Sequence, residues 1–295
     1  MISFNNMAEL IAMAEEKQVP IHEIVIAREM HVSQQPREKI WAAMAENWSV
    51  MQASIERGIE NEEKSLSGLT GGDAKRIYAY SQNDGGYLGS QATRAAAYAV
   101  GISEVNAVMG RIVACPTAGS CGIVPAALYA AQEQKGFPDD AIVGALFTAA
   151  GIGMVIDQNA SIAGAAGGCQ AECGTAAGMA AGALVELAGG KPEEIGHACA
   201  LAIKNLLGLV CDPVAGLVEV PCVKRNGFTA VLAMTAADMV LAGVRSVIPV
   251  DEVIDAMDRI GRSLPHALRE TSEGGLATTV TGRRLAAKIY PKQQK

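Results

Sequence analysis

The sequence predicts a mainly α-helical fold with glycine-rich loops and at most short strands. Apolar residues recur at helical spacing through most of the chain, and few segments show the alternation that is typical of strands. Of the 295 residues, 50% are hydrophobic but only 4% are aromatic, and 32 are glycine. A core of small aliphatic side chains lets helices approach closely, which favours packed helices over an aromatic-rich sheet sandwich.

Residues 1–62 are predicted to form an N-terminal helical segment. Apolar stripes with helical spacing lie in residues 8–13 and 21–26, and a longer amphipathic stretch contains Trp41 and Trp48. The two tryptophans lie on one face of that stretch. They are therefore predicted to form a packing seam and not a ligand site.

Residues 63–295 are predicted to form one continuous helical domain, in which helices alternate with glycine-rich loops. The stretch KSLSGLTGGD (64–73) breaks the helical pattern, and the side chain of Asp73 is expected to cap the next helix. The best strand candidates are Arg111–Cys115 and Val218–Val223. Further helices are expected at about 91–109, 121–135, 139–156, 171–188, 192–208, 228–246 and 250–262.

The charge pattern argues against several classes of partner. The formal net charge is −7, with acidic and basic residues interspersed, so there is no basic face for nucleic acid or a membrane surface. Glu9 interrupts the N-terminal stretch and no basic region precedes an apolar run, so no signal peptide is predicted. The longest apolar run, residues 141–156, is shorter than the roughly 18 to 20 residues that span a bilayer. It is predicted to be a buried helix, and a cytoplasmic location is expected.

The seven cysteines are the first candidates for chemistry, because disulfides are rare in a reducing compartment. Cys211 and Cys222 lie in CDPVAGLVEVPCVKRNG, and each has a nearby proline that restricts the backbone. Cys169 lies in the glycine loop GAAGGCQAECG. Thiols on such turns can be aimed at one point, and gathered thiolates require a cation to neutralise them. These three cysteines are therefore a candidate metal or cluster site.

The remaining cysteines, Cys115, Cys121, Cys173 and Cys199, are predicted to be small core residues, because free cysteine packs like a small hydrophobe. Cys173 also competes as a ligand, since it follows Cys169 by one helical turn. Four thiols on one zinc ion would make a closed structural site. Three thiols on an iron–sulfur cluster would leave one iron open for chemistry. Residue spacing alone leaves both arrangements open.

Three polar loops could contact a small anionic ligand. A helix start offers unpaired N–H groups and partial positive charge, and hydroxyl groups add directional donors. The loops match no phosphate-binding motif, so ordinary caps and turns remain an alternative reading. The candidate ligand-contacting residues are Ser65, Ser67, Thr70, Gly71, Gly72, Thr117, Ala118, Gly119, Ser120, Asn159 and Ser161.

Several long motifs resemble those of the iron–sulfur-dependent L-serine dehydratases. They are GRIVACPTAGSCGIVPAAL (110–128), NASIAGAAGGCQAECG (159–174), CDPVAGLVEVPCVKRN (211–226) and RETSEGGLATT (269–279). The stretch SLSGLTGGDAKR (65–76) resembles the start of that family's α chain, and the similarity covers most of residues 64–282. The chain length resembles the separate α subunit of the two-chain bacterial type, whose β subunit is a different polypeptide.

This resemblance implies that residues 63–295 form a helical iron–sulfur catalytic domain. The family holds a 4Fe–4S cluster on three cysteines, which the motifs GCQ, CDP and PC place at Cys169, Cys211 and Cys222. The implied reaction is deamination of L-serine to pyruvate and ammonia, with an open cluster iron acting as Lewis acid on the substrate hydroxyl and carboxylate. The implied partner is the β subunit. The resemblance assigns no general base to this chain, and the partner is a possible source.

Two alternative functions stay open from the sequence. Another iron–sulfur hydro-lyase could act on a small hydroxy acid with the same ligands, and only substrate tests separate it from a serine dehydratase. A zinc-stabilised helical scaffold without activity would use the thiols structurally. Metal and sulfide content distinguishes that scaffold from an iron–sulfur enzyme.

Overall fold

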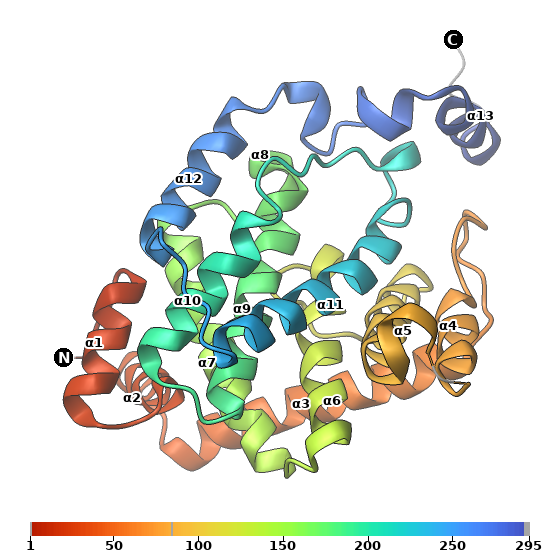
Figure 1. Cartoon of the computed structure of the whole chain (residues 1–295). Coiled ribbons are helices and arrows are strands. Elements are labelled where there is room, and N and C mark those ends of the chain that lie inside the picture. The colour runs from red at the N-terminus through yellow and green to blue at the C-terminus, as the bar shows by residue number, and fades with distance from the viewer. Residues whose placement is uncertain (1, 84, 292–295) are drawn as a thin grey trace.

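The structure, a computed structural model, describes residues 2–83 and 85–291, and these residues form helices and turns without a strand (Figure 1). An isolated parallel β-bridge joins Cys211 to Arg269. In chain order the α-helices are α1 (Met7–Lys17), α2 (Ile21–Ser33), α3 (Arg37–Glu60), α4 (Asp73–Ser81), α5 (Gly89–Ala107), α6 (Ile123–Lys135), α7 (Asp139–Asn159), α8 (Gly164–Gly167), α9 (Thr175–Leu187), α10 (Pro192–Lys204), α11 (Cys222–Leu241), α12 (Val250–Ser263) and α13 (Val280–Ile289). The predicted mainly α fold is confirmed.

Short 3-10 and π-helical turns connect these helices near the candidate site. The five residues after Cys169 form a π-helical turn, η3 (Gln170–Gly174), which continues directly into α9. Turns of this kind are frequent at functional sites. The 3-10 turns are η1 (Gly86–Leu88), η2 (Ala118–Ser120), η4 (Val214–Gly216), η5 (His266–Leu268) and η6 (Gly275–Thr278).

Both strand candidates were wrong. Arg111–Cys115 runs as a loop, and the Arg111 carbonyl accepts a hydrogen bond from the Ser54 hydroxyl at 2.9 Å instead of from a neighbouring strand. Val218–Val223 forms a tight turn that enters α11, where the backbone N–H of Val223 already bonds the Glu219 carbonyl. The helix expected at 228–246 therefore begins earlier. Proline is favourable at a helix start, because its missing N–H has no partner there anyway.

Helices α9 and α11 lie in the middle of the molecule, with α3 along the bottom of the view and α12–α13 along the top (Figure 1). Helix α1 meets the start of α12, where the Met7 N–H donates to the Asp251 carboxylate at 2.8 Å. Nearly every residue of α9 is buried. The helix consists mostly of Ala and Gly, whose small side chains let neighbouring helices pack closely around it. A Cβ atom on Gly178 would lie 2.9 Å from the Sγ of Cys199 in α10. The close approach of these two helices therefore requires glycine at this position.

The N-terminal helices share one hydrophobic core with the rest of the chain. Phe4, Trp48 and residues of α7 and α9 belong to the same buried cluster. The Trp48 indole N–H donates to the Asp139 carboxylate at 3.0 Å, and Trp41 lies against Phe147 with ring centroids 5.8 Å apart. The predicted packing role of both tryptophans is confirmed. The boundary between residues 1–62 and 63–295 stays a prediction.

Within the described residues, α7 is the helix that is long and apolar enough to cross a membrane by length and composition. Its most apolar window is 67% buried inside the protein, where α7 packs against α2 and α9. The apolar run at 141–156 is therefore a buried helix, as the sequence predicted.

Candidate functional site

The three candidate cysteines come from separate segments and are all buried. Cys169 directly precedes η3, Cys211 forms the isolated bridge, and Cys222 is the first residue of α11. Their relative exposures are 2%, 2% and 8%. Burial raises the pKa of Cys222 to about 12 and also raises that of Cys211, and the neighbouring Cys169 raises both further. The structure thus brings the three thiols close enough for their charges to affect one another's pKa values.

Cys211 is held in place by the C-terminal part of the chain. Its backbone N–H donates to the Leu268 carbonyl at 2.9 Å, and its carbonyl accepts from the Glu270 N–H at 2.8 Å. The next side chain, Asp212, accepts a hydrogen bond from the backbone N–H of Leu276 at 2.8 Å. The RETSEGGLATT motif therefore forms one wall beside the Cys211 segment.

Arg225, one turn into α11, links two of the cysteine segments. Its guanidinium donates to the Val210 carbonyl at 2.8 Å and to the Asp212 carboxylate at 3.0 Å. Burial disfavours the charged guanidinium, but the neighbouring Cys169 and Asp212 outweigh burial and raise the pKa of Arg225. A partly buried cation beside the thiols offsets the negative charge that thiolates would bring. Sequence reasoning missed Arg225, although it lies within the CDPVAGLVEVPCVKRN motif.

Glu172 places a half-buried carboxyl group beside the same thiols. The Thr117 hydroxyl donates to it at 3.0 Å, and burial raises the pKa of Glu172. A Cβ atom on Gly164 would lie 3.0 Å from Glu172 Oε2 and 3.2 Å from Cys211 Sγ, so glycine keeps this space free. Glu172 was also missed, although its presence among Gly, Ala and Cys in GCQAECG is an available sequence signal.

The loop at 117–120 is tied to the start of α11 by Asn226, which is fully buried. The Asn226 amide donates to the Gly119 carbonyl at 2.8 Å and to the Cys222 carbonyl at 3.0 Å, and it accepts from the Gly122 N–H at 3.0 Å. Ala118 and Ser120 belong to the same turn, and the Ser120 hydroxyl lies 3.2 Å from that of Thr117. This predicted loop therefore lies next to Cys222 and Glu172.

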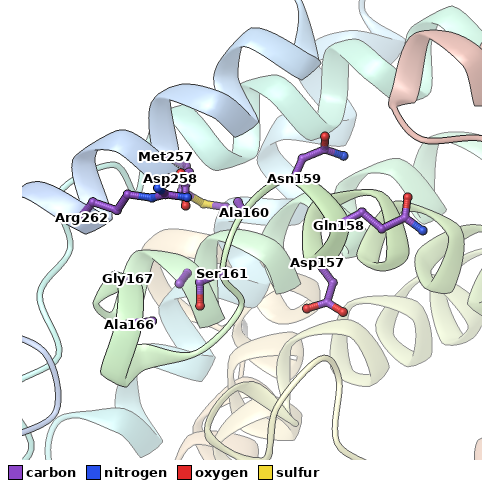
Figure 2. A pocket seen from close by; sticks show the side chains of 11 residues that line it. Asp157, Gln158, Asn159, Ala160, Ser161, Ala166, Gly167, Met257, Asp258 and Arg262 are labelled. Atoms are coloured by element: carbon purple, nitrogen blue, oxygen red, sulfur yellow. Dashed lines mark ion pairs between the residues drawn. The ribbon is translucent and has the colours of Figure 1, made fainter.

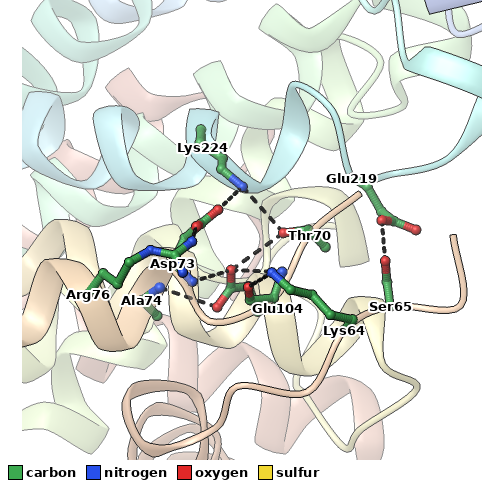
Figure 3. A network of polar contacts seen from close by, with 10 residues as sticks. Lys64, Ser65, Thr70, Asp73, Ala74, Arg76, Glu104, Glu219 and Lys224 are labelled. Atoms are coloured by element: carbon green, nitrogen blue, oxygen red, sulfur yellow. Dashed lines mark hydrogen bonds and ion pairs between the residues drawn. The ribbon is translucent and has the colours of Figure 1, made fainter. Parts of the chain in front are cut away.

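The loop at 65–72 meets the segment between Cys211 and Cys222 through Glu219 (Figure 3). The hydroxyls of Ser65 and Ser67 donate to the Glu219 carboxylate at 2.6 Å and 2.7 Å. Lys224 on α11 approaches the same loop, with its ammonium 3.4 Å from the Thr70 hydroxyl. Glu219 and Lys224 were not singled out from the sequence, because nothing local indicates a contact with a loop so far away in the chain.

The start of α4 is occupied by a carboxylate of the protein itself (Figure 3). Glu104 on α5 is buried and accepts from the backbone N–H groups of Gly71, Asp73 and Ala74 at 3.1, 2.9 and 3.2 Å. It also accepts from the Thr70 hydroxyl at 3.4 Å. The unpaired donors of a helix start are thereby satisfied from a neighbouring helix.

Asp73 was wrongly expected to be the cap of this helix. Gly72 occupies the cap position, and Asp73 is the first helical residue. The Asp73 side chain forms ion pairs with Arg76 and Lys224. An acidic residue in the first turn favours the helix through its dipole without acting as the cap.

Asn159 and Ser161 line the pocket shown in Figure 2, which the loop around Cys169 also borders through Ala166, Gly167 and Ala171. This pocket of about 400 Å³ is also lined by Asp157, Asp258 and Arg262 and includes none of the seven cysteines. The Asn159 amide donates to the Asn5 carbonyl at 2.6 Å. These contacts connect the end of α7 with the N-terminus.

The four other cysteines are buried, as predicted. Burial raises the pKa values of Cys115 and Cys121 to about 12, and Cys199 is enclosed between α9 and α10. Cys173 lies closest to the site, with its Sγ 3.4 Å from that of Cys169. A core position therefore accounts for three of these thiols, whereas Cys173 borders the candidate site.

The donor chemistry of the site fits an iron–sulfur cluster. Among residues 2–83 and 85–291, no group of three or more His, Cys, Asp or Glu side chains converges closely enough for a single metal ion. Cysteine thiolates are the usual ligands of iron–sulfur clusters, and each binds a different iron of a cubane. Buried thiols with raised pKa values become thiolates when a metal displaces their protons. Cys211 and Cys222 have this character, and Cys169, whose pKa the Cys173 thiol and Arg225 lower, loses its proton more readily than they do.

The fold and site define a mainly helical protein with a group of buried thiols beside carboxyl groups and one guanidinium. The model of the serine dehydratase alpha chain family matches residues 16–277. The chain belongs to this family, and the resemblance inferred from its motifs is confirmed.

Relatives of known name agree with this assignment. The probable L-serine dehydratase alpha chain of Bacillus subtilis is 53% identical over 287 residues, which cover 97% of this chain and 95% of that protein. The L-serine dehydratase alpha chain of Peptoniphilus asaccharolyticus is 44% identical over 281 residues, covering 95% and 96%. The L-serine dehydratase of Streptomyces coelicolor is 37% identical over 286 residues, covering 94% of this chain and 61% of that longer protein.

Proposed function

We propose that this chain is the α subunit of a two-chain, iron–sulfur-dependent L-serine dehydratase that converts L-serine to pyruvate and ammonia. Its family and the names of its relatives support the reaction. The observation that carries the cluster dependence is the joint burial of Cys169, Cys211 and Cys222 beside Arg225.

In this proposal Cys169, Cys211 and Cys222 hold a 4Fe–4S cluster through their thiolates. When bound, the cluster supplies an iron without a cysteine ligand, which acts as a Lewis acid on the substrate hydroxyl and carboxylate. Arg225 offsets the negative charge of the thiolates through its contacts with Cys169 and Asp212. The buried surroundings exclude water, which strengthens the electrostatic interactions within the site.

Two loops are proposed to bind L-serine, because both are tied to the turn that carries Cys222. Glu219 connects the first loop to this turn, and Asn226 connects the second. Hydroxyl and backbone N–H groups suit the carboxylate of an amino acid, and hydroxyl oxygens can accept from its ammonium group. The proposed contacts are Ser65, Ser67, Thr70, Gly71, Gly72, Thr117, Ala118, Gly119 and Ser120. Asn159 and Ser161 stay predicted contacts, although the pocket that they line includes none of the cysteines.

The partner is proposed to be a β chain, and the complex is proposed to act in the cytoplasm. Relatives named alpha chain match this chain over nearly their whole length, whereas the Streptomyces coelicolor protein is considerably longer. A separate chain that corresponds to the additional length would complete the enzyme. We propose that this β chain also supplies the general base that removes the α-proton of L-serine.

Anaerobic reconstitution tests the proposal. The chain is loaded with iron and sulfide, with and without its β chain, and pyruvate formation from L-serine is measured. We expect a brown protein that forms pyruvate, with visible absorbance that bleaches in air. A colourless active enzyme containing pyridoxal phosphate would overturn the proposal. Zinc without sulfide would favour the non-catalytic scaffold, and a preference for hydroxy acids in a substrate panel would favour another hydro-lyase.

A further inference from the structure

Glu219 is fixed to the cysteine-bearing segment by its own backbone. It lies in the turn between Cys211 and Cys222, with its N–H bonded to the Leu217 carbonyl at 2.7 Å. Its carbonyl accepts from the Val223 N–H at 3.0 Å, which is part of the first turn of α11. Any displacement of the Cys222 turn therefore moves the base of the Glu219 side chain with it.

The Glu219 side chain reaches across to the loop at 65–72 and is 7% exposed as a residue. One carboxylate oxygen, Oε2, accepts from the Ser65 hydroxyl (Figure 3) and also from the Ser67 hydroxyl. The two hydroxyl oxygens lie 3.0 Å apart, and that of Ser67 also accepts from the Leu69 N–H. A charged acceptor shared by two hydroxyls fixes the direction of both O–H bonds.

The loop has an anchored end and a tip with an exposed apolar side chain. Glu104 anchors the end that enters α4, through Gly71, Asp73 and Ala74. The side chain of Leu66, between the two serines, is fully exposed. Glu219 is therefore the group outside the loop that holds the serine hydroxyls at the tip, as far as the described residues show.

From this arrangement we propose that Glu219 is a positioning residue, which ties the substrate-binding loop to the segment that carries Cys211 and Cys222. The inference rests on the proposed function, because that function makes the loop a substrate contact. Through Glu219, the orientation of the Ser65 and Ser67 hydroxyls depends on the position of the Cys222 turn. The bound substrate and the cluster are thereby kept in register.

Kinetics of the reconstituted holoenzyme with its β chain test this role. Glu219→Ala is expected to raise the KM for L-serine at least ~10-fold, which is ~1.4 kcal/mol of binding, while visible absorbance per chain is retained. The change in kcat should be smaller. Glu219→Gln keeps an acceptor oxygen for the hydroxyls and should largely restore the KM.

Glu186→Ala is the matched control. Glu186 on α9 is also a nearly buried carboxylate and accepts hydrogen bonds from the Thr148 hydroxyl and the Ile21 N–H. These partners lie outside both the substrate loop and the cysteine segment. If Glu219→Ala leaves the KM unchanged, or if Glu186→Ala raises it equally, the positioning role is overturned.

Hydrogen–deuterium exchange tests the tie independently of activity. In the intact chain, Glu219→Ala should speed exchange of the amides at 65–70 and leave those of α4 unchanged, since Glu104 holds the latter. Equal exchange of these amides in the wild type and in Glu219→Ala would overturn the inference, whichever reaction the enzyme catalyses. The proposed function can also fail on its own. That is the conclusion if the reconstituted wild type forms no pyruvate while Glu219→Ala still shows faster exchange in the loop.

Discussion

The thiols of Cys169 and Cys173 lie 3.4 Å apart, and their pKa values are shifted in opposite directions. The hydrogen bond between them lowers the pKa of Cys169 and raises that of Cys173, and burial raises the latter further. Arg225 adds to the lowering at Cys169. Cys169 therefore becomes a thiolate more readily than Cys173, which makes them unequal candidates for metal binding.

Cys173→Ser should retain the cluster, because a serine hydroxyl can still donate to the Cys169 sulfur. The measurement is iron and sulfide content per chain after anaerobic reconstitution, together with visible absorbance. Values near those of the wild type are expected. Loss of one iron or of the colour would make Cys173 a fourth ligand.

Replacing any of Cys169, Cys211 or Cys222 with serine should abolish the visible absorbance, since each thiolate is expected to hold its own iron. Cys199→Ala is the control, because Cys199 is equally buried but packs between α9 and α10. Its absorbance should match the wild type. Similar behaviour of all four variants would refute the ligand assignment.

Gly164→Ala should reduce cluster content without unfolding the protein. The added methyl group would lie 3.0 Å from the Glu172 carboxylate and 3.2 Å from the Cys211 sulfur, so the neighbours must shift. Gly144→Ala in α7 is the matched control, because its methyl group would meet His22 at an ordinary 3.5 Å. Circular dichroism checks the fold of both variants. Full cluster occupancy in Gly164→Ala would contradict the crowding argument.

Glu104→Ala should destabilise the protein by about 1–3 kcal/mol, because it leaves buried N–H donors at the start of α4 without their acceptor. Urea unfolding measures the change. Glu104→Gln keeps one acceptor oxygen and should lie between Glu104→Ala and the wild type. The exposed Glu46→Ala is the control and should change the free energy of unfolding by less than about 0.5 kcal/mol. An equally small change in Glu104→Ala would show that water replaces this carboxylate.

Stability at alkaline pH should depend on Tyr98. Burial raises its pKa, and the hydrogen bond to Glu133 at 2.6 Å raises it further. The folded chain keeps this proton where an unfolded tyrosine, with a pKa of about 10, loses it. The contribution of Tyr98 to stability is fully present below a pH of about 10, and the free energy of unfolding falls as the pH rises above it.

Urea midpoints between pH 9 and 11 measure this effect. The urea midpoint of Tyr98→Phe should fall less steeply with pH than that of the wild type, because phenylalanine has no proton to lose. The lost hydrogen bond to Glu133 lowers stability by a similar amount at every pH in this range and does not change the slope. Equal slopes in the two proteins would contradict the prediction.

Local sequence patterns predicted most of the fold, because buried faces recur at helical spacing in helices such as α7 and α12. The error at α11 has a local cause. Val218 and Val223 suggested a strand, but Pro221 starts a helix whose first residue is Cys222. Short apolar stretches do not separate these alternatives by periodicity alone.

The cysteines and loops of the candidate site were visible in the sequence, whereas the groups that hold them were not. Glu104, Glu219 and Arg225 act through partners that lie far away in the chain or on another helix. In sequence they resemble ordinary charged residues beside helices. Only the folded arrangement indicates which carboxylates face hydroxyls or helix starts and which face solvent.

The hydrogen bonds that join Cys211 to Leu268 and Glu270 set a time order for biosynthesis. Helices near the N-terminus can form while the ribosome is still translating, but this wall of the site exists only after the later segment has emerged. In the proposed cluster enzyme, iron delivery would therefore follow translation of nearly the whole polypeptide. Before that step, the cluster-binding thiols of a nascent chain would lack this wall and would be open to oxidants.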